Sequence, residues 1–103
     1  MADPMKIRAS LVGDSTEVKV LMSHEMESGQ RKDAQGQTIP AWFIKNVTVT
    51  CNDRTVLSAQ WGTAVSKNPF LSFKFKGGAK GDKITVTWTD TRGDTRTDVA
   101  AIA

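Results

Sequence analysis

Cysteine and histidine are nearly absent from this sequence. Its 103 residues include one cysteine, Cys51, and one histidine, His24. A single cysteine cannot close an internal disulfide, and neither residue type is numerous enough for a zinc finger or a di-histidine metal site, so no cofactor is expected. Cys51 lies in a strand-like stretch, which favours an inert core thiol. The alternatives are an intersubunit disulfide and a nucleophile with His24 as its base.

Long apolar runs are also missing. The longest such stretch, residues 41–44, is far shorter than the roughly 20 residues that span a bilayer, so no membrane association is expected. Residues 1–8 lack the apolar core of a secretory signal, and an exported form is therefore expected to be mature or to travel with a partner. Apolar residues make up 39% and charged residues 24%, as in globular proteins, and the length predicts a single domain over residues 1–103.

Helical periodicity is absent, and apolar residues alternate with polar ones instead. Val18, Val20 and Met22 share one face of a strand predicted over residues 17–22, and a second strand is predicted over residues 43–51 with Cys51 pointing inward. Further strands are expected at residues 5–10, 55–60, 71–76, 84–89 and 95–102. About seven short strands in a chain of this length predict an all-β fold, an immunoglobulin-like antiparallel β-sandwich.

Two of these strands flank a cluster of lysines. Residues 71–76 and 84–89 alternate regularly on either side of a glycine-rich turn at residues 77–82, which predicts that they pair as a hairpin. This region contains Lys74, Lys76, Lys80 and Lys83. Lysines on an edge strand block unwanted strand pairing, and we favour this interpretation. The alternative, given the net charge of +3, is a basic β-domain that binds single-stranded nucleic acid.

One long segment breaks the alternation. Residues 23–41 are polar, charged and interrupted by two glycines, which predicts a loop between two strands. Compact domains rarely keep connections longer than about 12 to 15 residues unless those connections bind a partner or are disordered. The loop is therefore the predicted functional segment.

The loop and several later segments resemble one known family. The run HEMESGQRKD at residues 24–33, followed by Gly36, Ile-Pro at residues 39–40 and Phe-Ile at residues 43–44, is similar to the signature of the SoxZ family. The resemblance continues through SKNPFLSF at residues 66–73, and then through Trp-Thr-Asp at residues 88–90 and Gly-Asp-Thr at residues 93–95. It covers nearly the whole chain, and it is weakest before Ser10 and in the lysine-rich turn.

This resemblance implies a sandwich that pairs with a SoxY-type subunit, whose glycine-rich C-terminal arm has a cysteine that carries thiosulfate-derived intermediates during sulfur oxidation. The present chain ends in Val-Ala-Ala-Ile-Ala, so it is expected to be the non-catalytic subunit of that heterodimer. The family also implies transient contacts with a thiosulfate-oxidising cytochrome, a sulfate thiohydrolase and a sulfane dehydrogenase. Neither nucleic acid nor a membrane is an expected partner. A periplasmic location is implied, reached by export with the partner.

The long loop supplies most of the residues expected to bind the partner. Arg31 offers a planar guanidinium that binds a carboxylate bidentately, and Glu27 is expected to order the loop by pairing with it. Met26 is interpreted either as core filler or as an adaptable interface residue. His24 is expected to be held by a backbone hydrogen bond rather than to act as a base. The predicted partner-binding residues are His24, Met26, Glu27, Arg31, Lys32, Asp33 and Trp42.

The three tryptophans occur in different sequence contexts. Trp88 lies in a regular alternating strand and is predicted to belong to the core. Trp42 and Trp61 flank turns and are candidate interface anchors, because tryptophan is enriched in the residues that contribute most to binding.

Overall fold

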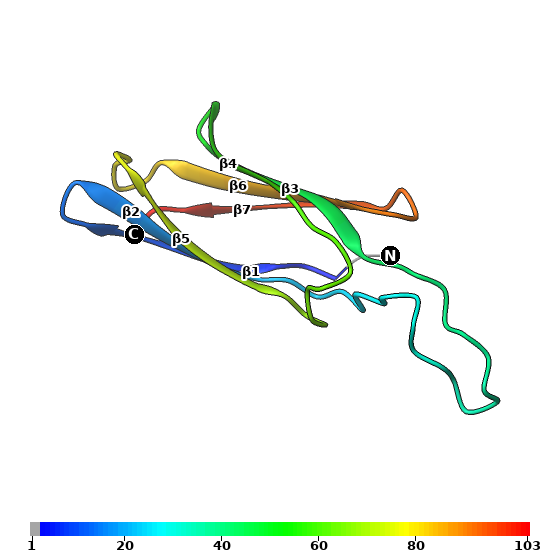
Figure 1. The fold of residues 1–103 in the computed structure, drawn as a ribbon. Helices are drawn as coiled ribbons and strands as arrows, with labels where there is room; N and C mark the ends of the chain where they lie inside the picture. The colour runs from blue at the N-terminus through cyan, green and yellow to red at the C-terminus, as the bar shows by residue number, and fades with distance from the viewer. Residues whose placement is uncertain (1–2) are drawn as a thin grey trace.

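The chain folds into two antiparallel β-sheets that pack face to face. A computed structural model describes residues 3–103, and this part of the chain contains seven strands and no helix (Figure 1). The strands are β1 (Lys6–Val12), β2 (Ser15–Leu21), β3 (Ile44–Cys51), β4 (Arg54–Gln60), β5 (Phe70–Lys76), β6 (Lys83–Asp90) and β7 (Thr95–Ala101). Within the described residues no helix is long and apolar enough to cross a membrane. The predicted all-β sandwich is confirmed.

The strand order is that of an immunoglobulin-like sandwich. One sheet has the order β1-β2-β5 and the other has the order β4-β3-β6-β7. The chain crosses between sheets after β2, after β4 and after β5, whereas β1–β2, β3–β4 and β6–β7 are hairpins. Such crossings place strands that are distant in sequence next to each other, as in Greek-key folds.

The apolar face predicted for each strand forms the core between the sheets. Val18, Val20 and Met22 are at most 1% exposed, and Trp88 is 2% exposed. The rest of the buried apolar cluster contains Met5, Ala9, Met26, Ile44, Val47, Val49, Cys51, Ile84, Val86 and Ile102. Each strand contributes alternate residues because successive side chains of a strand point to opposite faces of its sheet. The core positions of Trp88 and Cys51 are therefore confirmed.

The predicted hairpin of residues 71–76 and 84–89 was wrong. β5 pairs with β2 in one sheet, while β6 pairs with β3 and β7 in the other. Residues 77–82 form a connection between the sheets, and Gly77, Gly78 and Gly81 in it have φ angles of 100°, 89° and 91°, which favour glycine. Each strand alternates because one of its faces lies in the core. Alternation therefore identifies the strands without showing which of them pair.

The lysine-rich strand is an edge strand, as predicted. β5 is the last strand of the three-stranded sheet, and its Lys74 and Lys76 side chains are exposed. Phe70 lies on the same outward face of β5 and is 61% exposed, so one aromatic residue does share this face with the lysines. The position of these lysines fits protection of a free sheet edge.

Candidate functional site

The connection from β2 to β3 extends from the sandwich as a two-stranded ribbon, which we define as residues 27–42. At its base, Glu27 and Trp42 donate backbone N–H groups to each other's carbonyl oxygens, at 2.6 and 2.9 Å. Further out, the Ile39 N–H donates to the Arg31 carbonyl oxygen at 2.8 Å. Figure 1 shows the ribbon projecting beyond one end of the sheets. The predicted loop is thus an ordered, extended element that presents its residues away from the core.

The tip of the ribbon is ordered by Asp33. Its Oδ1 accepts backbone N–H groups from Gln35 at 2.9 Å and from Gln37 at 3.0 Å, as in the Asx turns that aspartate commonly forms. The Asp33 N–H donates to the Gln37 carbonyl oxygen at 2.9 Å. Gly36 between them has a φ of 79°. Asp33 therefore shapes the tip, and Lys32 beside it is exposed.

Glu27 and Arg31 form a bidentate ion pair along one limb of the ribbon. The Arg31 Nε donates to Glu27 Oε1 at 3.0 Å, and the second guanidinium nitrogen donates to Glu27 Oε2. The hydrogen bond from Arg31 lowers the pKa of Glu27 below its ordinary value. Only 9% of Glu27 is exposed, whereas 64% of the Arg31 side chain is exposed. The pairing predicted from sequence is confirmed, and it holds the guanidinium at the surface.

Asp90, the last residue of β6, anchors the base of the ribbon. Its Oδ2 accepts a hydrogen bond from Trp42 Nε1 at 2.7 Å and contacts His24 Nε2 at 3.0 Å. Its Oδ1 accepts the N–H groups of Arg92 and Asp94, both at 2.9 Å. Burial alone would raise the pKa of Asp90, but the hydrogen bonds from these four residues outweigh it and lower the pKa. One carboxylate thus joins Trp42 at the end of the ribbon, and His24 just before its start, to the β6–β7 turn.

The hydrogen bonds of His24 fix its tautomer. The Met26 N–H donates to His24 Nδ1 at 3.0 Å, so Nδ1 carries no proton and the hydrogen lies on Nε2, which donates to Asp90. The His24 side chain is only 2% exposed. Its ring is 4.9 Å from that of Trp42 and 5.2 Å from that of Trp88. The predicted backbone hydrogen bond is confirmed, and both ring nitrogens are engaged within the protein.

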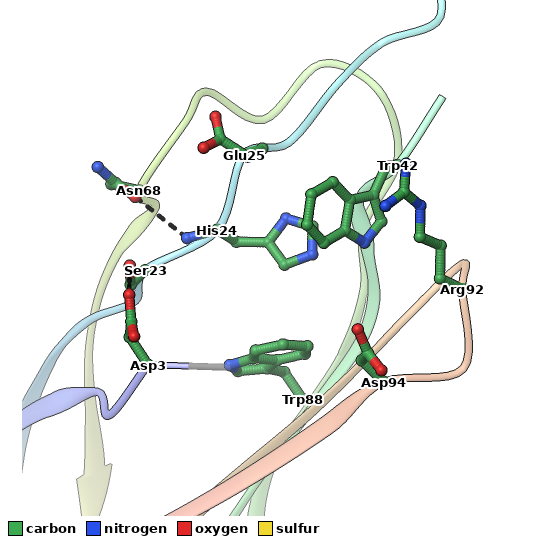
Figure 2. Close-up of a pocket in the computed structure, with 9 residues that line it drawn as sticks. All are labelled: Asp3, Ser23, His24, Glu25, Trp42, Asn68, Trp88, Arg92 and Asp94. Carbon is green, nitrogen blue, oxygen red and sulfur yellow. Dashed lines mark hydrogen bonds between the residues drawn. The ribbon is translucent and has the colours of Figure 1, made fainter. Parts of the chain in front are cut away.

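A polar cleft of about 370 Å³ lies beside this anchor. Figure 2 shows the His24, Trp42 and Trp88 rings around it, with the Arg92 side chain next to Trp42. The Arg92 guanidinium carbon is 4.0 Å from the Trp42 ring centroid, a cation–π contact that covers one side of this half-buried indole. Acidic residues line the same cleft, namely Asp3, Glu25 and Asp94. The mixed charges favour no single class of small ligand.

The predicted partner-binding residues divide into an anchored group and a surface group. Met26 is 6% exposed and accepts the Ile44 N–H on its sulfur at 3.3 Å, so it is core filler rather than an exposed interface residue. His24 is buried as well, and Trp42 is half-buried. The group with exposed side chains contains Arg31, Lys32 and Asp33.

Sequence reasoning missed the contributions of Asp90 and Arg92. The segment Asp-Thr-Arg-Gly-Asp at residues 90–94 has the composition of a turn, and nothing in it indicates a contact with a loop far earlier in the chain. His24 and Trp42 are 66 and 48 residues away from Asp90. Only the crossing of β2 and β3 between the sheets brings these three residues together.

Cys51 is not paired with His24. Cys51 ends β3 and lies opposite Ile84, whereas His24 contacts Asp90, which lies opposite Ile44 at the other end of β3. Seven residues along a strand separate the two sites by about 20 Å. Burial and the nearby Asp82 carboxylate raise the pKa of the Cys51 thiol. This thiol is therefore an inert member of the core, and the nucleophile hypothesis was wrong.

Family models assign most of this chain to a single family. The model described as sulphur oxidation protein SoxZ matches residues 5–101, a range that includes all seven strands, the ribbon and Asp90. No curated protein shows a significant match. The chain belongs to the SoxZ family of sulfur oxidation proteins.

Proposed function

We propose that this chain is the non-catalytic subunit of a periplasmic sulfur-carrier heterodimer, paired with a SoxY-type subunit whose cysteine carries thiosulfate-derived intermediates. The observation that carries the proposal is the SoxZ family match over residues 5–101. The state of Cys51 supports it, because the only cysteine of the sequence is buried and its thiol pKa is raised. A carrier thiol must be accessible and form a thiolate. The sulfur is therefore carried by the partner.

The residues at the base of the ribbon support a structural role rather than catalysis. His24 uses both ring nitrogens in hydrogen bonds to Met26 and Asp90, so neither is available to take a proton from a substrate. Asp90 in turn accepts four hydrogen bonds. A general base needs an open acceptor within reach of the proton that it abstracts. This network is suited to holding the ribbon in a fixed orientation.

The ribbon is the proposed docking element for the SoxY-type subunit and for the pathway enzymes, namely the thiosulfate-oxidising cytochrome, the sulfate thiohydrolase and the sulfane dehydrogenase. Arg31, Lys32 and Asp33 are exposed on a hydrogen-bonded projection. The outward-facing guanidinium of Arg31 is suited to a carboxylate on another protein. His24 and Trp42 act indirectly in this proposal, because they position the ribbon.

The decisive experiment is an intact-mass measurement. The purified chain is incubated with thiosulfate and the thiosulfate-oxidising cytochrome, with and without the SoxY-type subunit. We expect a sulfur adduct on the SoxY-type subunit and an unmodified mass for this chain in both mixtures. Iodoacetamide labelling provides a control, since Cys51 should react only after unfolding. An adduct on Cys51 would overturn the assignment.

The proposed location is tested by cell fractionation. We expect this chain in the periplasmic fraction when the SoxY-type subunit is produced with its signal sequence. Removal of that signal should retain both proteins in the cytoplasm. Export of this chain without its partner would contradict carriage by the partner.

Nucleic-acid binding remains the second candidate, favoured by a specific surface. The outward face of the three-stranded sheet carries Lys6, Arg8, Lys19, Lys74 and Lys76. Such a face attracts phosphates, and binding of this kind weakens steeply as salt rises. Fluorescence anisotropy with a labelled single-stranded oligonucleotide at low salt separates the two candidates. Absence of binding there would remove this alternative.

A further inference from the structure

The outward face of the four-stranded sheet consists mainly of uncharged residues, most of them threonines, with Lys83 in the row of Ala101 at one end of the face. Strand register places twelve outward residues in three rows of four across β4, β3, β6 and β7. The rows are Gln60-Asn46-Thr89-Thr95, Ser58-Thr48-Thr87-Thr97 and Thr55-Thr50-Thr85-Val99. We call this surface the threonine face. None of the twelve residues carries a charge, in a chain of which 24% is charged.

The outward face of the other sheet has the opposite character. Its register places twelve outward residues in four rows of three across β1, β2 and β5. The rows are Lys6-Leu21-Phe70, Arg8-Lys19-Ser72, Ser10-Glu17-Lys74 and Val12-Ser15-Lys76. We call this surface the cationic face, because it carries five basic residues and one acidic residue. The chain therefore does place charges on outward strand positions. The twelve residues of the threonine face carry none, and Lys83 lies beyond their last row at the start of β6.

The threonine face is suited to being covered by another protein. Threonine is β-branched and has restricted rotamers, so its burial costs less side-chain entropy than that of lysine or glutamate. The hydroxyls already pair across strands, with 3.0 Å between the Oγ1 atoms of Thr87 and Thr97. The Thr95 hydroxyl donates to the Trp88 carbonyl oxygen at 2.8 Å. These hydroxyls keep their hydrogen-bond partners when the face is covered, and none of the twelve residues carries a charge that would lose its water.

The ribbon alone is too small to hold a permanent partner. A stable interface typically uses roughly 20–30 residues on each side. The ribbon has only sixteen residues in total, and several of them pair with each other or pack against the sandwich. A permanent heterodimer therefore needs a second and larger contact surface on this chain.

We propose that the threonine face is this surface, and that the SoxY-type subunit packs one of its own sheets against it. This inference rests on the proposed function and adds the place where the partner binds. A second copy of this chain is the less suitable occupant, because each copy carries a net charge of +3 and two copies repel each other. The cationic face then stays exposed in the heterodimer, because burying five like charges would be costly.

Side-chain footprinting of the wild-type proteins tests the inference. Val99 on the threonine face is 55% exposed and Phe70 on the cationic face is 61% exposed, so the two residues form a matched pair of reporters. Carbene labelling is measured on the isolated chain and on the heterodimer with the SoxY-type subunit. We expect Val99 labelling to fall several-fold in the heterodimer while Phe70 labelling stays unchanged.

Substitutions at the centre of each face provide the second measurement. Thr87→Lys introduces a charge into the threonine face and should raise the dissociation constant of the heterodimer by at least about tenfold, since a buried unpaired charge is costly. Ser72→Lys makes a comparable change on the cationic face and should leave the dissociation constant unchanged. Thr87→Val keeps the shape without a charge and should preserve pairing. Circular dichroism of each isolated variant checks the fold.

The outcomes separate the inference from the proposed function. If wild-type chains do not pair with the SoxY-type subunit, the proposed function fails and the inference fails with it. If they pair while Val99 stays fully labelled, or while Thr87→Lys folds and pairs normally, only the inference is overturned. If Val99 becomes protected when this chain is concentrated without a partner, a second copy is the occupant, and the inference is again overturned.

Discussion

Asp90 is the residue on which the geometry of the ribbon depends. Its two carboxylate oxygens accept hydrogen bonds from four donors. Two are the side-chain N–H groups of His24 and Trp42, which flank the ribbon base, and two are backbone N–H groups of the β6–β7 turn. The residue is fully buried. A buried carboxylate is stable only when hydrogen bonds replace the water that it loses. The position of the proposed docking element is therefore tied to one side chain.

Replacement of Asp90 by asparagine should destabilise the protein. An asparagine keeps one acceptor oxygen, but its amide nitrogen replaces the other and is itself a donor. Two of the donors that now bind Asp90 would then face another donor. We expect a loss of about 2–5 kcal/mol in the free energy of unfolding, measured by chemical denaturation.

Asp94→Asn is the matched control for this change. It removes the same charge from the same turn, at an exposed position. Its unfolding free energy should stay within about 0.5 kcal/mol of the wild type. Equal stability of the Asp90 and Asp94 variants would show that Asp90 does not hold the ribbon base.

The contribution of Asp90 to the free energy of unfolding should fall as the pH is lowered. The pKa of this carboxyl is lowered in the folded protein, so the unfolded state binds a proton at higher pH than the folded state. Its stabilisation is fully present above about pH 4, the ordinary range of an unfolded aspartate, and is lost as the pH falls through the lower folded pKa.

The difference in unfolding free energy between wild type and Asp90→Asn should therefore shrink below about pH 4. Other carboxylates with lowered pKa values, Glu27 and Asp98, are present in both proteins and cancel in the difference. Unfolding free energies measured from neutral to acid pH check this expectation. A difference that widens in acid would contradict it.

The sequence predicts the positions and contacts of some of these residues but not of others. The burial of Val18, Val20 and Trp88 follows from local alternation, and the Glu27–Arg31 pair lies four residues apart on one limb. The contacts of Asp90 with His24 and Trp42 depend on how distant strands cross. A local pattern carries no information about such contacts, and for this reason Asp90 was not among the predicted residues.

At the scale of elements, the connection between β5 and β6 explains why strand pairing was harder to predict than strand position. A six-residue connection is long enough either to turn back within one sheet or to cross to the other. Here Gly78 approaches Thr16, whose buried hydroxyl donates to the Gly77 carbonyl oxygen at 2.7 Å. This close packing of the connection on β2 fixes the crossing. It depends on Thr16, a residue of a strand far earlier in the chain.

Gly78→Ala should therefore destabilise the fold more than a similar change nearby. An added Cβ would collide with the Thr16 hydroxyl and lie 3.1 Å from Ile102 Cδ1, at a φ of 89° that alanine rarely adopts. We expect a loss of about 2–4 kcal/mol. Gly81→Ala is the control, because Gly81 has a similar φ of 91° but open space around it.

The Gly81 variant should lose only the backbone cost of about 1–2 kcal/mol. Chemical denaturation of both variants separates the collision from the backbone effect. Equal losses for the two glycines would indicate that the contact with Thr16 does not constrain the crossing.

The proposed docking role of the ribbon can be tested separately from the stability of the fold. Arg31→Ala removes an exposed guanidinium from one limb, while the backbone bridge between Glu27 and Trp42 remains. The thermal unfolding midpoint should therefore stay close to that of the wild type. The heterodimer, or its turnover by the pathway enzymes, should become weaker by roughly tenfold, as expected when one charged contact is lost.

Arg8→Ala is the control for Arg31→Ala, since Arg8 is exposed on the cationic face, away from the ribbon. Calorimetry of heterodimer formation and steady-state thiosulfate oxidation compare the two variants. If Arg31→Ala unfolds readily, the ribbon is structural. If it folds, pairs and supports oxidation at the wild-type rate, the docking role is wrong.

At the scale of the whole molecule, the two outward faces divide the charge unevenly. Five of the fourteen lysines and arginines project from the cationic face, whereas the twelve residues of the threonine face include none and Lys83 lies beside them at the start of β6. Charges that remain exposed act over distances of about 10 Å at moderate salt and steer encounters with oppositely charged proteins. An uncharged face instead supports contacts that persist. Under the proposal above, the threonine face binds the permanent partner and the cationic face serves brief encounters.

This division predicts how heterodimer stability responds to salt. Screening weakens attraction between charges but has little effect on contacts between uncharged hydroxyl and methyl groups. If the SoxY-type subunit covers the threonine face, the equilibrium dissociation constant should change by less than about threefold between roughly 0.05 and 0.5 M sodium chloride. Pairing through the cationic face would instead weaken by a factor of ten or more, because several ion pairs would be screened together. Calorimetric titration across this range distinguishes the two, and Arg31→Ala in parallel removes the contribution of Arg31. A steep salt dependence that persists in Arg31→Ala and disappears in a Lys19→Gln, Lys74→Gln double variant would place the partner on the cationic face.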